Sequence, residues 1–129
     1  MTSSSTQLKP TEVPTEAQEQ AALFEWASYN LGKYPALLLM YHIPNERKNA
    51  LEAMRLKAQG VKAGVPDVCL PVPNGKYAAL YIEMKRTKRW QLSDVQREWI
   101  AALNRAGNKA VVCKGWEEAR DAIIEYLSK

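Results

Sequence analysis

Residues 65–85 read VPDVCLPVPNGKYAALYIEMK, and this stretch decides the fold. It holds two apolar runs rich in β-forming residues, 65–72 and 77–84. Pro73, Asn74, Gly75 and Lys76 between them are typical turn residues. The pattern predicts two neighbouring strands joined as a hairpin.

Polar side chains interrupt both predicted strands. Asp67 lies early in the first, while Glu83 and Lys85 lie at the end of the second. Side chains alternate between the faces of a strand, so Glu83 and Lys85 share a face. A two-residue turn at Asn74-Gly75 would put Asp67 on the opposite face. We therefore expect an odd-numbered loop or a bulge there, with the glycine adopting a positive φ.

The chemistry of this group predicts a divalent metal ion. Two carboxylates a few ångströms apart repel each other at low dielectric, and Mg²⁺ or Mn²⁺ between them relieves the repulsion. Asp67 and Glu83 supply hard oxygen ligands, and the main-chain carbonyl of Met84 is a further candidate ligand. Lys85 is then placed to orient or deprotonate a metal-bound water, or to pair with a phosphate. The alternative is a half-exposed strand that presents a salt-bridged Glu83 and Lys85 to water.

Helices and strands alternate along the rest of the chain. Residues 1–14 are rich in Ser, Thr and Pro, and we expect a flexible tail there, followed by a single domain of residues 15–129. Thr15 is a candidate N-cap for a helix over 16–31. The hydrophobic patterns then predict a strand over 37–43, a short helix over 50–58, a helix over 94–106, a strand over 110–113 and a helix over 116–127. The helix over 94–106 is expected to turn Val95, Trp99, Ala102 and Leu103 inward.

Composition is that of an ordinary globular protein, with 47% hydrophobic and 25% charged residues. No apolar run approaches the ~18 residues that a membrane span needs, and no secretory signal sequence is evident. Cys69 and Cys113 lie in apolar runs without further ligands at metal spacing. We expect buried free thiols in a reducing compartment rather than a disulfide or a zinc pair.

Positive charge is concentrated around the predicted strands. Residues 40–90 hold ten Lys and Arg against four acids, a net +6, while eight basic and ten acidic residues elsewhere give −2. Such a surface attracts polyanions, although a face solvated for solubility has the same composition. The candidate phosphate contacts are Asn45, Arg47, Lys48, Lys57, Lys62, Arg86, Lys88 and Arg89. Trp90, next in the chain, either stacks on a base or anchors the connection to the following helix.

Together these motifs resemble those of the VRR-Nuc (virus-type replication-repair nuclease) family of PD-(D/E)xK nucleases. The resemblance covers residues 15–127. It rests on Gly64-Val65-Pro66-Asp67, Tyr81-Ile82-Glu83-Met84-Lys85, His42-Ile43-Pro44-Asn45-Glu46, Gly60-Val61-Lys62-Ala63, Leu92-Ser93-Asp94-Val95-Gln96, and on Glu16, Gln20 and Trp26 in the first helix.

The resemblance implies an α/β fold with a restriction-endonuclease-like core, a mixed central sheet flanked by helices in the order α-β-β-β-α-β-α. It also implies phosphodiester hydrolysis with Mg²⁺ or Mn²⁺, metal ligation by Asp67 and Glu83, and a catalytic Lys85. Glu16 would be a further carboxylate near the metal, and Gln96 a supporting residue.

Three of these residues have a second interpretation from the sequence alone. Glu16 is also a first-turn acid that complements the helix dipole, and Glu19 replaces it in the site if the register differs by a turn. Gln96 is also a candidate solvent-facing helix residue. His42, the single histidine, either approaches the substrate or makes a structural hydrogen bond.

The favoured hypothesis is an endonuclease acting on branched or otherwise structured DNA such as a Holliday junction. A homodimer would help so small a domain span two arms of a junction. The alternatives are a non-catalytic nucleic-acid-binding module on the same fold and an enzyme acting on RNA or another phosphate ester. The chain resembles stand-alone phage and bacterial members, so a cytoplasmic location, in a bacterium or a phage-infected host cell, is expected.

Overall fold

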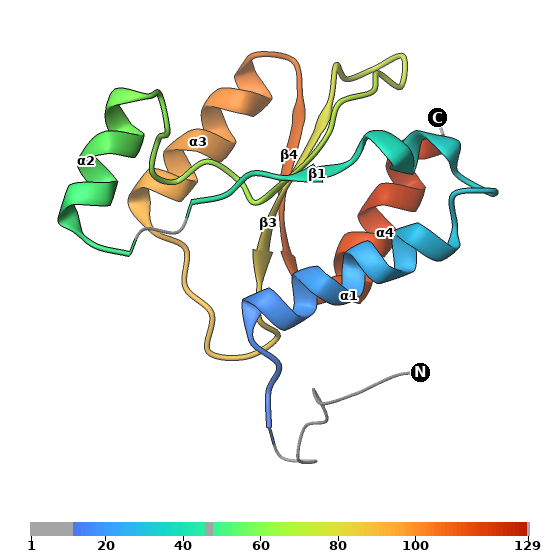
Figure 1. Cartoon of the computed structure of the whole chain (residues 1–129). Coiled ribbons are helices and arrows are strands. Elements are labelled where there is room, and N and C mark those ends of the chain that lie inside the picture. Colours follow the sequence, from blue (N-terminus) through green and yellow to red (C-terminus); the bar gives the residue numbers. More distant parts are fainter. Residues whose placement is uncertain (1–11, 46–47, 129) are drawn as a thin grey trace.

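A four-stranded mixed sheet lies at the centre of the computed structural model, which describes residues 12–45 and 48–128 (Figure 1). In chain order the elements are α1 (Glu16–Tyr29), the 3₁₀ helix η1 (Pro35–Leu39), β1 (Tyr41–His42), α2 (Ala50–Ala58), β2 (Val68–Leu70), β3 (Leu80–Lys85), α3 (Asp94–Arg105), β4 (Lys109–Lys114) and α4 (Trp116–Leu127). None of the helices in these described residues is long and apolar enough to cross a membrane.

The strands follow one another in the order β1-β2-β3-β4. β1, β2 and β3 pair antiparallel, whereas β3 and β4 pair parallel and are connected through α3. A parallel pair needs such a crossover connection. α1 and α4 pack on one side of the sheet and on each other, and α3 lies on the other side against β4 (Figure 1). The predicted mixed sheet flanked by helices is confirmed.

The register of β2 and β3 agrees with the sequence argument. Val68 pairs with Ile82 and Leu70 with Leu80, and the connection over residues 71–79 holds an odd number of residues. Gly75 within it has a φ of +89°. Extended by one residue beyond the paired strands, the same register sets Asp67 opposite Glu83, which is the arrangement that the sequence predicts.

The predicted strand over 37–43 is wrong for most of its length. The chain forms η1 there, and only Tyr41 and His42 pair with β2. Pro35 opens η1 because its fixed φ suits a first helical turn. The apolar run that suggested a strand buries Leu37 but leaves Leu38 75% exposed.

Two other expectations need correction. β2 begins only at Val68, so Asp67 precedes the strand rather than interrupting it. α3 has no buried residue, and Val95 is 44% exposed instead of facing inward; Ala102 is exposed as well. α3 rests on the sheet through half-buried apolar side chains, those of Trp99, Ile100 and Leu103.

The core lies between the sheet and the α1–α4 pair. Its largest members are Leu23, Leu70, Leu80, Ile82, Met84, Ile123 and Tyr126. Cys69 and Cys113 are buried free thiols, as predicted, and burial raises the pKa of the Cys113 thiol to about 12. α2 lies outside this core, with no buried residue and no close approach to another helix or strand of the described chain.

Candidate active site

Asp67 lies directly before β2 and is held in place by hydrogen bonds from two other segments of the chain. Its main-chain oxygen accepts hydrogen bonds from the Ile43 N–H (2.7 Å) and from His42 Nδ1 (2.8 Å). Its carboxylate oxygen Oδ2 accepts the Met84 N–H over 2.7 Å. Asp67 therefore links β1 to β3, and its carboxylate lies beside the next strand.

The glycine that precedes this aspartate is required by the backbone. Gly64 has a φ of +88°, and a Cβ at this position would collide with Val95 Cγ1. A larger residue would therefore collide with α3 and be strained in the left-handed region. This close contact directs the chain through the buried Pro66 to Asp67.

Glu83 and Lys85 are buried on the same face of β3. Their exposures are only 2% and 5%, which excludes the interpretation of a pair presented to water. Lys85 Nζ lies 3.8 Å from Glu83 Oε2 and 3.9 Å from Glu16 Oε2. Buried charges on a strand are costly unless they are paired, and here the lysine ammonium and the two carboxylates offset one another's charge.

Gln96, in the first turn of α3, connects the two charged residues. Its Nε2 donates to Glu83 Oε2 over 3.0 Å, and its Oε1 accepts from Lys85 Nζ over 3.1 Å. The same Oε1 accepts the Ser93 N–H, while the Ser93 hydroxyl accepts the Gln96 N–H, which completes a capping box. The helix start and the candidate site thus share one side-chain amide.

The electrostatics of Glu83 are those of a carboxyl buried beside a second acid. Burial raises the pKa of the Glu83 carboxyl to about 8, the neighbouring Asp67 adds to the rise, and Lys85 opposes it. Glu83 Oε1 is buried without a hydrogen-bond partner. A buried acceptor without a donor costs roughly 1–3 kcal/mol, and a cation at that oxygen would relieve the cost.

The residues present fit a hard divalent cation. Asp67 and Glu83 offer carboxylate oxygens, which are the ligands that Mg²⁺ and Mn²⁺ prefer. Within residues 12–45 and 48–128, no three His, Cys, Asp or Glu side chains gather at metal-binding spacing. Further ligands would therefore come from water or from main-chain carbonyl oxygens, among which that of Met84 is the predicted ligand.

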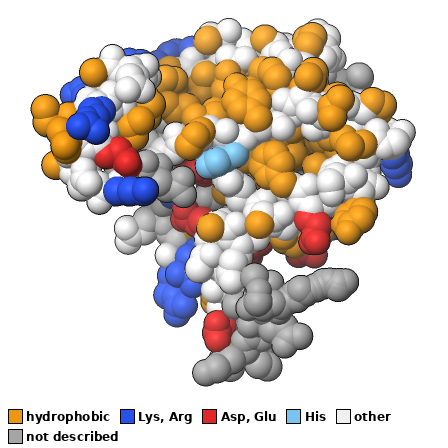
Figure 2. Space-filling view, in the orientation of Figure 1, with side chains coloured by type: hydrophobic (Ala, Val, Ile, Leu, Met, Phe, Trp, Pro, Cys, Tyr) orange, Lys and Arg blue, Asp and Glu red, His pale blue; other side chains and the backbone are white. Residues whose placement is uncertain are grey.

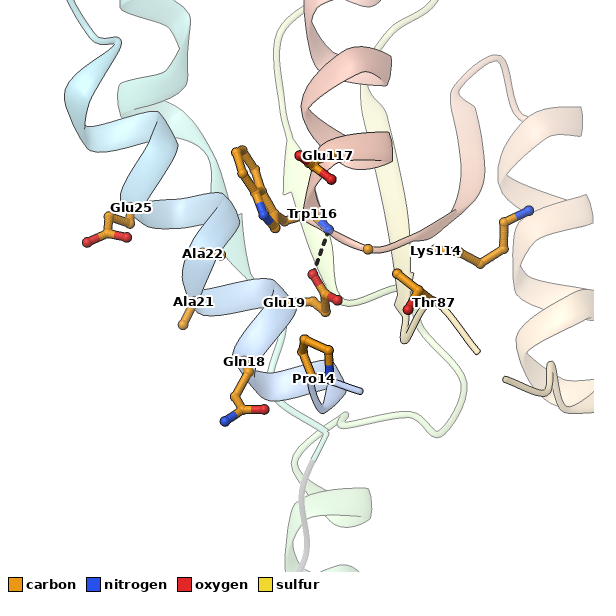
Figure 3. A pocket seen from close by; sticks show the side chains of 11 residues that line it. Pro14, Gln18, Glu19, Ala21, Ala22, Glu25, Thr87, Lys114, Trp116 and Glu117 are labelled. Carbon is orange, nitrogen blue, oxygen red and sulfur yellow. Dashed lines mark hydrogen bonds between the residues drawn. The ribbon is translucent and has the colours of Figure 1, made fainter. Parts of the chain in front are cut away.

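The two acids in the first turn of α1 lie in different environments. Glu16 is half exposed and pairs with Lys85 at the edge of the group. Glu19 is 5% exposed and points to the start of α4, where its Oε1 accepts the Trp116 N–H over 3.0 Å (Figure 3). The structure therefore places Glu16, rather than its substitute Glu19, beside Lys85.

Glu19 also lines a cavity of about 650 Å³ between the starts of α1 and α4. Its other walls include Pro14, Thr87 and Trp116 (Figure 3). Neither Glu83 nor Lys85 lines it. The cavity is thus a feature separate from the group around Gln96.

The predicted phosphate contacts fall into two groups. Lys48, Lys57 and Lys62 are exposed around α2, and Lys88 and Arg89 are exposed on the loop after β3. Arg86 is half buried and donates from Nη2 to the Val13 carbonyl, while its Nε is buried without a partner. Asn45 is half buried with an unpartnered Oδ1, and Arg47 lies outside the described residues.

The sequence did not predict the contact between His42 and Asp67. The two residues are far apart in the chain, and a structural hydrogen bond was only one of two interpretations of His42. Ser93, which caps α3, also belongs to the hydrogen-bond network of the site, and the sequence did not predict that second role. The spacing Ser93-x-x-Gln96 carried that signal, because a capping box fixes the position of its glutamine side chain.

Comparisons with known proteins agree with this geometry. The family model of the VRR-NUC domain matches residues 14–117, which include Glu16, Asp67, Glu83, Lys85 and Gln96. The chain is also similar to a solved structure described as a VRR_NUC domain protein, with 30% sequence identity, a TM-score of 0.79, and 91% of each chain covered. No curated protein matches the chain.

Proposed function

The chain belongs to the VRR-NUC family of nucleases, and from this premise we propose that it is an endonuclease that cleaves DNA with Mg²⁺ or Mn²⁺. The observation that carries the proposal is the buried group of Asp67, Glu83, Lys85 and Gln96, with one carboxylate oxygen left without a partner. A family likeness alone would leave open whether the site is intact.

Each side chain has a defined part in the proposed reaction. Asp67 and Glu83 would hold the ion, whose chemistry when bound would be to activate a water and stabilise charge on the phosphate. Lys85 is fixed by Gln96 and Glu83 with its ammonium at the site, where it orients the attacking water or contacts a phosphate oxygen. Glu16 holds the other side of that ammonium.

Charge supports a nucleic-acid polymer as the substrate. Residues 40–90 carry a net +6, and the exposed lysines around α2 and the exposed cations after β3 flank the site along the chain. Contacts of this kind fix the position of a phosphate backbone without reading its sequence. We take DNA as the polymer and branched DNA as the preferred form.

A homodimer would let this small domain act on two strands of a junction. Hydrophobic side chains gather over and beside β1 on one face of the molecule (Figure 2). Leu38 and Leu39 of η1 and Tyr41 of β1 are 75%, 54% and 50% exposed. Contiguous exposed apolar surface of this kind is typical of an interface. Light scattering of the free protein measures the mass, and a monomer at working concentrations would contradict this part.

The central test is cleavage of supercoiled plasmid and of a four-way junction with Mg²⁺, Mn²⁺ or EDTA. Lys85→Ala should abolish cleavage and leave DNA binding largely intact. Lys76→Ala is the matched control, because Lys76 is exposed on the loop between β2 and β3, away from the site. Cleavage that persists in Lys85→Ala would refute the catalytic role of Lys85. DNA binding by the wild type without cleavage would favour the non-catalytic nucleic-acid-binding module. Cleavage of RNA alone would show that RNA, and not DNA, is the substrate.

A further inference from the structure

The loop between β3 and α3 leaves the candidate active site and returns to it. Residues 86–92 begin directly after Lys85 and end directly before Ser93. The hydrogen bond from Lys85 Nζ to Gln96 Oε1, over 3.1 Å, connects the strand before this loop to the helix after it. Both ends of the loop therefore lie at Lys85, the residue that the proposed function makes catalytic.

Trp90 is the large aromatic side chain of this loop, and it is 41% exposed. It does not belong to the hydrophobic core or to the side chains that pack against the core. The interpretation that Trp90 anchors the strand to the helix therefore has no support from packing. An indole exposed to this extent beside an active site is a candidate contact surface.

One side of the indole is already occupied by a cation. Lys114 Nζ lies 5.2 Å from the centre of the Trp90 ring. Lys114 pairs with Lys85 in the parallel ladder of β3 and β4, and Figure 3 shows its side chain extending away from α1. The ring thus lies beside the strand ends that carry the catalytic lysine. Because Trp90 is 41% exposed, part of the indole is open to a flat ligand beside this cation.

The neighbours of Trp90 in the loop are cationic. Residues 86–92 contain three basic and no acidic side chains. Lys88 and Arg89 are exposed, and Arg89 has a φ of +55°, a conformation that costs a non-glycine residue roughly 1–2 kcal/mol. The strained backbone at the tip displays cations and an aromatic ring together, which is the combination found on single-strand binding surfaces.

We propose that Trp90 stacks on an unpaired base of DNA beside the active site, with Lys88 and Arg89 on the adjacent phosphates. This inference rests on the proposed function, since it assigns the preference for branched DNA to one side chain. In a continuous duplex both faces of each base are covered by neighbouring bases, so only a junction, gap or flap offers a free face. Stacking of one base on an aromatic side chain changes affinity about 5- to 150-fold.

The test compares two short DNA probes that differ only in pairing. One is a continuous duplex, and the other has a gap with an unpaired 2-aminopurine, whose fluorescence falls when it stacks. Binding is measured with Ca²⁺ in place of Mg²⁺, for the full chain and for Trp90→Ala, Trp90→Phe and Tyr29→Ala. Tyr29 is 81% exposed at the last turn of α1 and serves as the control for loss of an exposed aromatic.

We expect the wild type to bind the gapped probe more tightly and to quench its fluorescence. Trp90→Ala should lose about 5- to 150-fold in affinity for the gapped probe and little for the duplex. Trp90→Phe should retain most of the preference, and Tyr29→Ala all of it. Thermal melting of each variant verifies that it is folded, and the Phe variant keeps the test valid if the Ala variant is not.

Cleavage of the same probes with Mg²⁺ separates this inference from the proposed function. Cleavage by the wild type, together with an unchanged preference in Trp90→Ala, would overturn the role of Trp90 and leave the nuclease standing. Trp90-dependent binding without any cleavage would support the stacking surface and count against the nuclease. Equal loss of affinity for both probes, or no DNA binding by the wild type, would also overturn the stacking proposal.

Discussion

Gln96 Nε2 lies 3.0 Å from Glu83 Oε2, and through this bond the first turn of α3 fixes a buried carboxylate of β3. The other atom of the same amide accepts from Lys85, so a single side chain sets the orientation of an acid and a base. The amide is itself held by Ser93 in the capping box. The geometry of the candidate site therefore depends on a local helix signal as well as on packing.

Gln96→Ala should reduce cleavage roughly 10- to 100-fold, because Glu83 and Lys85 both lose the group that orients them. Ser93→Ala is the matched control, since it removes the serine half of the capping box and leaves the amide bonds to Glu83 and Lys85 in place. Both variants should lose about 1 kcal/mol of stability from the weakened cap. The measurements are single-turnover cleavage and urea unfolding, and similar activity losses in both variants would contradict the orienting role.

The metal-free protein should lose stability as pH rises from about 4.5 to about 8. The pKa of Glu83 is about 8 in the folded chain, above its ordinary value of 4.5. In this window the folded state binds a proton that the unfolded state has released, so the free energy of unfolding falls by at most ~1.4 kcal/mol per pH unit. Below about pH 4.5 Glu83 contributes its full stabilisation of the folded state, and above about pH 8 this stabilisation is lost.

Glu83→Gln isolates this effect, because the amide does not titrate. Urea unfolding in EDTA from about pH 5 to about pH 9 should show a steeper decline for the wild type than for the variant. Glu25→Gln, at an exposed position of α1, should behave as the wild type. Added Mg²⁺ should stabilise the wild type most at high pH, where Glu83 is ionised. Parallel curves for wild type and Glu83→Gln would show that the carboxyl titrates normally.

Local patterns predicted the parts of the site that depend on local geometry. Alternation along a strand placed Glu83 and Lys85 on one face, and the parity of the loop around Gly75 was deduced from the need to bring Asp67 to the same side. The burial of the pair was not predictable in the same way, because it depends on tertiary contacts such as those that Gln96, in the first turn of α3, makes with both side chains. Helix positions follow from caps and periodicity for the same local reason.

The predictions that were wrong or missing concern positions that tertiary contacts decide. The run around Leu38 is as apolar as a strand, but its neighbour Pro35 opens a 3₁₀ turn and little of the run meets the sheet. Val95 fits the helical apolar period, yet it meets the Gly64 backbone instead of the core. His42 reaches Asp67 only because β1 and β2 are adjacent, and no spacing in the chain encodes that contact.

Glu16 and Glu19 should give opposite results when each is replaced by alanine. Glu16 is half exposed, so Glu16→Ala should change stability by less than ~0.5 kcal/mol. It should lower cleavage roughly 10-fold or more, because the Lys85 ammonium loses one of its two carboxylate partners. Glu19→Ala should cost about 1–3 kcal/mol, since it leaves the Trp116 N–H at the start of α4 without its buried acceptor.

Cleavage per folded molecule should be unaffected by Glu19→Ala. Unfolding curves report the fraction folded at the assay temperature, and the cleavage rate is divided by that fraction. A Glu19 variant that is stable but inactive would place this acid in the reaction. A Glu16 variant with full activity would reduce Glu16 to a first-turn acid that favours the helix dipole.

His42 should act on the reaction through the position of Asp67. Its Nδ1 lies 2.8 Å from the Asp67 carbonyl oxygen, which can only accept, so this nitrogen carries the proton. His42→Phe removes the donor and keeps a ring of similar size, whereas His42→Asn keeps an N–H donor near the same place. Loss of a group that orients a metal ligand typically costs 10- to 100-fold in metal affinity or activity.

We therefore expect His42→Phe to need roughly 10-fold or more Mg²⁺ for half-maximal cleavage, and His42→Asn to recover most of that loss. Mg²⁺ titrations of the cleavage rate measure the requirement, and the Mg²⁺-dependent rise in melting temperature reports binding without catalysis. A variant that is merely less stable would lower both curves without shifting their midpoints. Equal midpoints for the Phe variant and the wild type would mean that the Ile43 N–H alone, at 2.7 Å from the same oxygen, suffices to hold Asp67 in place.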